Sequence, residues 1–300
     1  MDNVTHTLVG LMLARAGLEK TTVRGAGMMM LAANAPDIDA VFWFGGTLPY
    51  LEYHRSYPHA IAFAPLLALL PMLLVRAKFG WRPYLASIAG VLSHLLLDWT
   101  NVYGIPLALP FSPHRFRLDT VNIFDLWIWV ILLGALAATA ISRRFSACAA
   151  LGALLLYEGF RLGTHERAVD VMSARLYEGA SPRRVTALAG PFNPLEWRGI
   201  IEGEGFVILQ AVDLLGNYDE GRLYRTAAPI PAMDAALRTR PFQVFSRFAE
   251  VPFWKVTPVE GGLRLDLIDL RFSTPDRAGF ASVSAIVDGT GNVLRAGFGI

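Results

Sequence analysis

Residues 34–39, Asn-Ala-Pro-Asp-Ile-Asp, and residues 54–59, His-Arg-Ser-Tyr-Pro-His, stand out in this 300-residue sequence. They place two carboxylates, two imidazoles and a guanidinium in an otherwise very apolar segment. Because proline lacks an N–H and restricts the residue before it, Pro36 predicts that a helix ends or kinks there. Five of the six histidines precede residue 115. The ionisable chemistry is therefore concentrated in the apolar half of the chain.

Apolar runs extend outward from this stretch in both directions. Hydrophobic residues make up 54% of the sequence and charged residues 17%, which is more apolar than a typical soluble protein. Each run is shorter than the roughly 20 residues of a usual spanning helix, so each alone could be a buried core helix. Their succession, bounded by arginines, favours a membrane all-α helical bundle of about four or five hydrophobic helices in residues 1–163. The runs are 4–16, 25–35, 60–75, 83–97, 126–141 and 145–160.

The basic connections between these runs predict an orientation. Residues 15–24, 76–82 and 143–144 carry the arginines and lysines, and the positive-inside rule places them on the cytoplasmic side. The opposite helix ends, which carry the polar candidates, then lie on the extracytoplasmic side. The aromatic residues 42–44 would anchor that interface. We therefore expect a multi-pass protein of the inner (cytoplasmic) membrane, with the lipid bilayer as its main partner.

Residues 164–300 have a different composition. They hold 15 Lys+Arg and 16 Asp+Glu, against 12 and 9 in residues 1–163. A polar linking helix over 164–180 is followed by short β-type runs, so we expect a small mainly-β soluble domain on the same side as the polar site. Trp197 is expected to anchor its packing. The predicted strands are 205–212, 251–257, 263–271, 280–287 and 292–298.

The chemistry-bearing residues predict a metal site. His94 and Asp98 are four residues apart and so share one helix face. The single cysteine, Cys148, excludes a thiolate cluster and is expected to be a packed, inert thiol. Imidazole and carboxylate ligands suit zinc or manganese, and magnesium is an alternative. Seven candidates exceed the three protein ligands of one catalytic zinc, which favours one or two divalent ions. The candidates are His6, Asp37, Asp39, His54, His59, His94 and Asp98.

Two further residues are candidates for catalysis. Arg55 would bind a developing anion, or it would simply pair with Glu52. Asp125 would take part in catalysis, or it would cap the next helix. A lone histidine in an apolar helix is commonly a satisfied core group, but ionisable groups within a membrane are costly and mark function. His114 and His165 belong to none of these motifs and are expected at the surface.

These motifs resemble those of the YdjM-like inner-membrane proteins, described as LexA-regulated, metal-dependent membrane hydrolases. The resemblance covers most of the chain and implies a multi-pass membrane protein with a metal hydrolase site. Tyr57-Pro58 departs from the Gly-[small]-Thr-His loop of many members. The motifs are Asp2-x-x-x-His6, Asn34-x-Pro36-Asp37-x-Asp39, His54-Arg55-x-x-x-His59, His94-x-x-x-Asp98 and Asp125.

Two classes of function follow from the sequence. The first is a membrane-embedded metal-dependent hydrolase that acts on a lipid or lipid-linked (phospho)ester at the membrane face. The alternative is a non-enzymatic membrane protein, a transporter or a regulatory scaffold, that uses the same His/Asp cluster. The net charge of +2 and the lack of a basic run give no reason to expect nucleic-acid binding.

Overall fold

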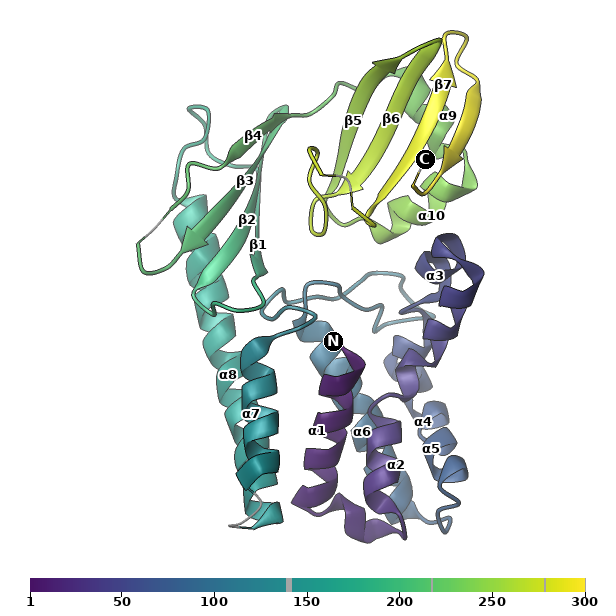
Figure 1. The fold of residues 1–300 in the computed structure, drawn as a ribbon, viewed down its shortest axis with the longest axis vertical. Helices are drawn as coiled ribbons and strands as arrows, with labels where there is room; N and C mark the ends of the chain where they lie inside the picture. Colours follow the sequence, from purple (N-terminus) through teal and green to yellow (C-terminus); the bar gives the residue numbers. More distant parts are fainter. Residues whose placement is uncertain (139–141, 217, 278, 300) are drawn as a thin grey trace.

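The chain folds into an N-terminal helical part and a C-terminal part built from two antiparallel sheets (Figure 1). This computed structural model describes all residues except 139–141, 217, 278 and 300. The helices of the first part are α1 (Asn3–Ala16), α2 (Gly25–Ala32), α3 (Thr47–Tyr53), α4 (Ala64–Leu67), α5 (Leu69–Leu74), α6 (Trp81–Thr100), α7 (Leu126–Ala137) and α8 (Arg143–Ser173). Short 3-10 helices lie between them at η1 (Leu18–Thr21), η2 (Ala35–Gly45), η3 (Tyr57–His59) and η4 (Ile61–Phe63).

The prediction of four or five hydrophobic spanning helices is confirmed only in part. Of the described helices, α8 alone is long and apolar enough to cross a membrane. A second candidate is the pair Thr47–His59 and Ile61–Leu74, which is bent by 65°. Several large apolar side chains nevertheless face outward, including Leu73 at 68% and Leu156 at 78% exposure. Such an apolar exterior is typical of a surface that contacts lipid or a protein partner.

The basic connections gather at one end of the helical part. Figure 1 shows the α1–α2 and α5–α6 connections, together with the end of α7 and the start of α8, at the end farthest from the two sheets. Nε of Arg144, at the start of α8, donates a hydrogen bond of 3.1 Å to the carbonyl oxygen of Ala16. This common end agrees with the predicted topology, while the side of the membrane on which it lies stays a prediction.

Glycines allow α1, α2 and α6 to pack very closely. A Cβ atom on Gly10 in α1 would lie 2.7 Å from the carbonyl oxygen of Met29 in α2. A Cβ atom on Gly90 in α6 would lie 2.6 Å from Cβ of Ala32. Real Cβ atoms do not approach so closely, and packed cores tolerate added atoms poorly. The two glycines therefore set the distances between these three helices.

We expect Gly90→Ala to lower the free energy of unfolding by about 1–3 kcal/mol, because the added methyl group pushes α6 away from α2. Thermal unfolding of the detergent-purified protein, followed by circular dichroism, measures the change. Gly152→Ala in α8 is the matched control, since a Cβ atom there meets nothing within 4 Å. Equal unfolding temperatures for the two variants would contradict the close approach of α2 and α6.

The C-terminal part contains two four-stranded sheets rather than the single small β domain that we predicted. The five predicted strands correspond to β3 and β5–β8, whereas β1, β2, β4 and two helices were not predicted. In the first sheet the strands follow the order β1 (Arg184–Ala189), β2 (Glu196–Gly203), β3 (Phe206–Asp213) and β4 (Arg222–Arg225). In the second they follow the order β5 (Pro252–Val259), β6 (Gly262–Asp269), β7 (Ser282–Asp288) and β8 (Val293–Gly297). The helices α9 (Pro231–Leu237) and α10 (Arg240–Phe248) lie between the two sheets in the sequence.

The two sheets pack against different partners. The first shares a buried core with Met172 of α8, and Trp197 of β2 is fully buried in it. The second packs against α9 and α10, with Phe242 and Phe245 fully buried. Tyr103, from the connection between α6 and α7, also lies in this second core. The helical part and the second sheet are therefore joined by buried side chains.

The long helix α8 joins the helical part to the first sheet. It runs without a break across residues 163–164, so the predicted linking helix is its C-terminal portion, and the domain division at that point stays a prediction. The guanidinium of Arg161 lies 4.1 Å from the centroid of the Trp197 ring, and its Nε donates to the carbonyl oxygen of Thr120 at 2.8 Å. Trp197 is thus a packing anchor, as predicted.

Two predictions about single side chains along α8 were wrong. His165 is half-buried, with its ring centroid 5.3 Å from that of Trp197, because the first sheet covers this part of the helix. Cys148 is exposed rather than packed. Cys148 therefore lies on the outward-facing side of α8, whereas the neighbouring Ala147 and Ala150 pack into a buried core.

Candidate metal centre

The polar cluster is assembled from five separate segments. Asp37 and Asp39 lie on η2, His54 lies at the end of α3, His59 ends η3, His6 lies in α1, and His94 and Asp98 lie on successive turns of α6. The predicted break at Pro36 is confirmed, because α2 ends at Ala32 and the 3-10 helix begins at Ala35. This break turns the two aspartates toward α6 near the end of the helical part that faces the sheets.

Five of the six separations among four donor atoms are close to those of a metal coordination shell. Nε2 of His59 lies 3.3 Å from Nε2 of His94, 3.4 Å from Oδ1 of Asp37 and 3.6 Å from Oδ2 of Asp98. Nε2 of His94 lies 3.7 Å from Oδ1 of Asp37 and 3.5 Å from Oδ2 of Asp98. Ligands about 2.1 Å from a tetrahedral ion are separated by about 3.4 Å. The measured separations fit that geometry.

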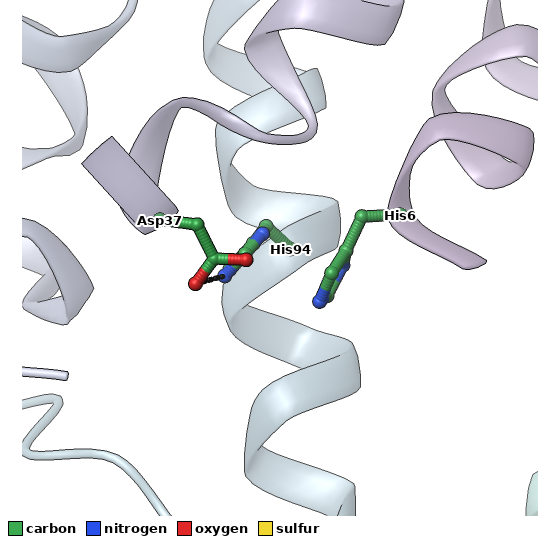
Figure 2. A group of neighbouring side chains, drawn as sticks. All are labelled: His6, Asp37 and His94. Atoms are coloured by element: carbon green, nitrogen blue, oxygen red, sulfur yellow. Dashed lines mark ion pairs between the residues drawn. The ribbon is translucent and has the colours of Figure 1, made fainter. Parts of the chain in front are cut away.

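His6 extends the cluster on the side of α1. Figure 2 shows His6, Asp37 and His94 turned toward one another, and these three residues form one of three groups with metal-ligand spacing. The rings of His6 and His94 are stacked, with centroids 3.7 Å apart. Neither ring nitrogen of His6 has a hydrogen-bond partner among the described residues, although His6 is fully buried. A buried imidazole without partners is costly unless it binds an ion or a water.

The outer ring nitrogens of the two central histidines, His59 and His94, face oxygen atoms of other groups. Nδ1 of His94 lies 2.8 Å from the carbonyl oxygen of Ala33, and Nδ1 of His59 lies 3.2 Å from Oδ2 of Asp39. When Nδ1 carries the proton, Nε2 presents its lone pair to an ion. Oδ1 of Asp39 also lies 2.8 Å from Nδ1 of His54. Asp39 therefore orients His54 directly, whereas Nδ1 of His59 lies beside Asp39 without a hydrogen bond among the described residues.

All seven predicted ligands belong to the cluster. The three groups with metal-ligand spacing are His6–Asp37–His94, His59–His94–Asp98 and Asp37–Asp39–His54. Together they contain the seven candidates and, within the part of the chain that the structure describes, no other residue. The mixture of imidazole nitrogen and carboxylate oxygen fits zinc or manganese better than calcium.

Arg55 lies against the cluster and not against Glu52. Its Nη2 lies 3.0 Å from Oδ2 and 3.1 Å from Oδ1 of Asp98, while Glu52 pairs with Arg240 at 2.9 Å. The alternative pairing of Arg55 with Glu52 was therefore wrong. Arg55 has a φ of 52°, in the left-handed region that non-glycine residues rarely adopt. Its Nε has no hydrogen-bond partner among the described residues. Backbone strain of this kind is concentrated at functional sites.

Asp125 lies at the start of α7. Its Oδ1 accepts hydrogen bonds from the backbone N–H groups of Trp127 and Ile128, at 3.0 and 3.3 Å, and from the hydroxyl of Tyr157 at 3.0 Å. These are the bonds of a helix N-cap, which confirms the capping prediction. Asp125 belongs to none of the groups with metal-ligand spacing in the described chain. Its predicted part in catalysis stays a prediction.

Sequence reasoning missed several supporting residues. Asn3 donates from Nδ2 to Oδ2 of Asp37 at 2.8 Å, and Asn101 donates from Nδ2 to Oδ1 of Asp98 at 3.0 Å. Asn101 lies three residues after Asp98, a helical spacing that could have indicated the contact. The α-amino group of Met1 also contacts Asp98. The Tyr103 ring centroid lies 4.3 Å from the Arg55 guanidinium, a contact that local spacing does not reveal.

Comparison with known proteins relates the chain to one family. The chain is 29% identical over 150 residues to "Uncharacterized protein YfhP" of Bacillus subtilis (strain 168), a match covering 46% of each protein. The match thus spans about half the length of that relative. No solved structure matches the chain significantly. The family model described as "YdjM inner membrane protein" matches residues 1–168, which include every residue of the cluster. From this match over more than half of its length, the chain belongs to the YdjM inner membrane protein family.

Proposed function

We propose that this protein is a membrane-embedded metal-dependent hydrolase that cleaves a lipid or lipid-linked phosphoester at the membrane face. The observation that carries the proposal is the convergence of seven His and Asp side chains from five segments, α1, η2, the end of α3, η3 and α6, on one largely buried cluster. Ionisable groups at such a depth are costly, and two or three of them would suffice for a structural hydrogen-bond network. The spacing of their donor atoms supports a site for one or two ions.

Each part of the cluster has a proposed role. Asp37, His59, His94 and Asp98 would hold a divalent ion, and His6 would complete that shell or contribute to a second one. When bound, the ion lowers the pKa of a coordinated water and polarises the scissile bond. Arg55, with its free Nε, would stabilise the negative charge that develops on the substrate oxygens. These roles rest on the distances and on the unpartnered nitrogens described above.

The surroundings support a substrate that lies near the lipid headgroups. Trp43 and Phe44, on the same 3-10 helix as Asp37, are 66% and 91% exposed. Exposed aromatic side chains of this kind anchor proteins at the membrane–water interface. We propose that the protein spans the inner membrane several times, with the cluster and the sheets on the extracytoplasmic side. The basic connections at the opposite end support this orientation.

Metal analysis of the detergent-purified protein tests the proposal. We expect one or two equivalents of zinc or manganese per chain, and at least a tenfold loss in an Asp37→Ala/His94→Ala variant, since two of the proposed ligands are removed. His114→Ala is the matched control, because His114 is exposed and lies outside the cluster. Elemental mass spectrometry gives the metal content, and circular dichroism confirms that the variants are folded.

A negative result would have a clear meaning. If the wild-type protein bound no ion after incubation with zinc, manganese and magnesium in turn, the hydrolase proposal would be wrong. The cluster would then be better explained by a transporter or a scaffold, in which His and Asp relay protons or hold the helices together.

A further inference from the structure

A cleft of about 270 Å³ opens beside the cluster, between the helical part and α10. His54 and Arg55 line it on the side of the cluster, and Val244, Arg247 and Phe248 line it from α10. Its remaining walls come from α3 and from the connection between α6 and α7, which contributes Pro106, Leu109, Pro113 and Arg115. The cleft thus lies where residues far apart in the sequence meet, next to the proposed reaction centre.

The cleft has an excess of positive charge. Glu52 is its one acidic lining residue, and Arg240 already neutralises it at 2.9 Å. Arg115 and Arg247 form no ion pair within 4.0 Å among the described residues. Nε of Arg115 is buried without a hydrogen-bond partner, and its Nη2 is held by the carbonyl oxygen of Gly104 at 3.0 Å. Two guanidinium groups therefore lack a counter-charge.

The surroundings of Arg115 also make its positive charge costly. Burial and, to a smaller extent, the nearby positive charges of Arg55 and Arg271 lower the pKa of Arg115 to about 10. The side chain stays charged at neutral pH, yet desolvation makes that charge costly. An anion seated in the cleft would relieve both the desolvation and the mutual repulsion of the arginines.

We propose that this cleft is the substrate-binding site and that Arg115 and Arg247 bind a phosphate group of the substrate beside Arg55. Guanidinium groups match phosphate oxygens in geometry and form paired, charge-assisted hydrogen bonds with them. The apolar part of the lining, including Leu51 and the half-exposed Tyr57, accommodates the rest of the substrate. The inference rests on the proposed hydrolase function and assigns the C-terminal part a role in it. The helical part alone does not contain Arg247.

Phosphate binding by the metal-depleted full-length protein tests this proposal separately from the metal site. The purified protein is treated with EDTA, and titration calorimetry measures its affinity for inorganic phosphate. In a second arm, the probe is detergent micelles that contain phosphatidic acid, with phosphatidylcholine micelles as the reference. We expect Arg115→Ala and Arg247→Ala each to weaken phosphate binding about tenfold. Arg238→Ala is the control, because Arg238 is exposed at the end of α9 and does not line the cleft.

The outcomes separate the two proposals. Equal phosphate affinity in the wild type and in the Arg115→Ala and Arg247→Ala variants, or no binding after metal removal, would overturn the cleft assignment and leave the metal proposal intact. Phosphate binding that survives EDTA in a protein that never holds metal would overturn the hydrolase and keep the anion site. A preference for phosphatidic acid micelles over inorganic phosphate would identify a lipid headgroup as the ligand. The reverse preference would identify a soluble phosphate compound.

Discussion

Replacing Asp98 with alanine should lower the free energy of unfolding by about 3–5 kcal/mol, even in EDTA. Asp98 is fully buried, and its carboxylate lies within 3.1 Å of Arg55, 3.5 Å of His6 and 3.5 Å of His94. Without it, the guanidinium of Arg55 would be a buried charge that has lost its carboxylate partner, which is much more costly than a missing surface pair. Chemical unfolding in detergent, followed by tryptophan fluorescence, measures the change.

A second substitution separates the charge effect from simple loss of packing. In Asp98→Ala/Arg55→Met the orphaned charge is also removed, so we expect part of the stability to return while metal binding stays lost. Asp276→Ala serves as the surface control, because Asp276 pairs with Arg222 at an exposed site, where solvent screens the pair and its loss should change the stability little. If the double variant were less stable than Asp98→Ala, the charge that Arg55 keeps in the single variant would not be the cause of the lost stability.

Replacing Arg271 with alanine should also destabilise the protein by about 3–5 kcal/mol. Arg271 pairs with Asp269 at 2.7 Å in a fully buried position. It also donates to the carbonyl oxygens of Tyr103 at 3.0 Å and Phe248 at 2.9 Å. These bonds tie the second sheet to the connection whose Tyr103 ring lies against Arg55. The substitution would leave a carboxylate and several backbone carbonyls without partners.

The effect of Arg271→Ala should reach the segment beside the His/Asp cluster. Because the carbonyl oxygen of Tyr103 loses its hydrogen bond from Arg271, we expect a protease to cleave the connection 101–125 faster in the variant than in the wild type. Arg264→Ala is the matched control, since Arg264 pairs with Asp266 on the same strand but is partly exposed. Unchanged proteolysis together with an unchanged unfolding free energy would show that the second sheet does not hold this connection in place.

The candidate metal centre could be predicted from the sequence more fully than the fold could. Pro36 marked the break that turns Asp37 and Asp39 toward α6, and helical spacing placed His94 and Asp98 on one face. These are local rules of the backbone, and they need no knowledge of distant residues. The strands β1 and β2 were missed because their burial depends on α8 and on the neighbouring sheet, which a local pattern does not contain. The four residues of β4 are largely exposed and show no alternating apolar pattern.

The partners of single side chains, like the missed strands, could not be predicted from local sequence patterns. Glu52 is close to Arg55 in the sequence, but it pairs with Arg240, 188 residues further along. Arg271 reaches Tyr103 across 168 residues. Asp125 was equally compatible with catalysis and with capping until the hydrogen bonds of α7 were known. Each of these contacts depends on how whole elements are arranged in space.

By itself, the sequence determined the membrane character, the common end of the basic connections and the seven His and Asp candidates. Those features follow from composition, helical periodicity and the restrictions that proline imposes. Only the tertiary structure decided that Arg55 forms an ion pair with Asp98 and that the C-terminal part contains two sheets. It alone showed that Arg115 and Arg247 face the same cleft as the cluster. The physical reason is that side-chain pairing and burial are set by non-local packing, which brings together segments that no local spacing relates.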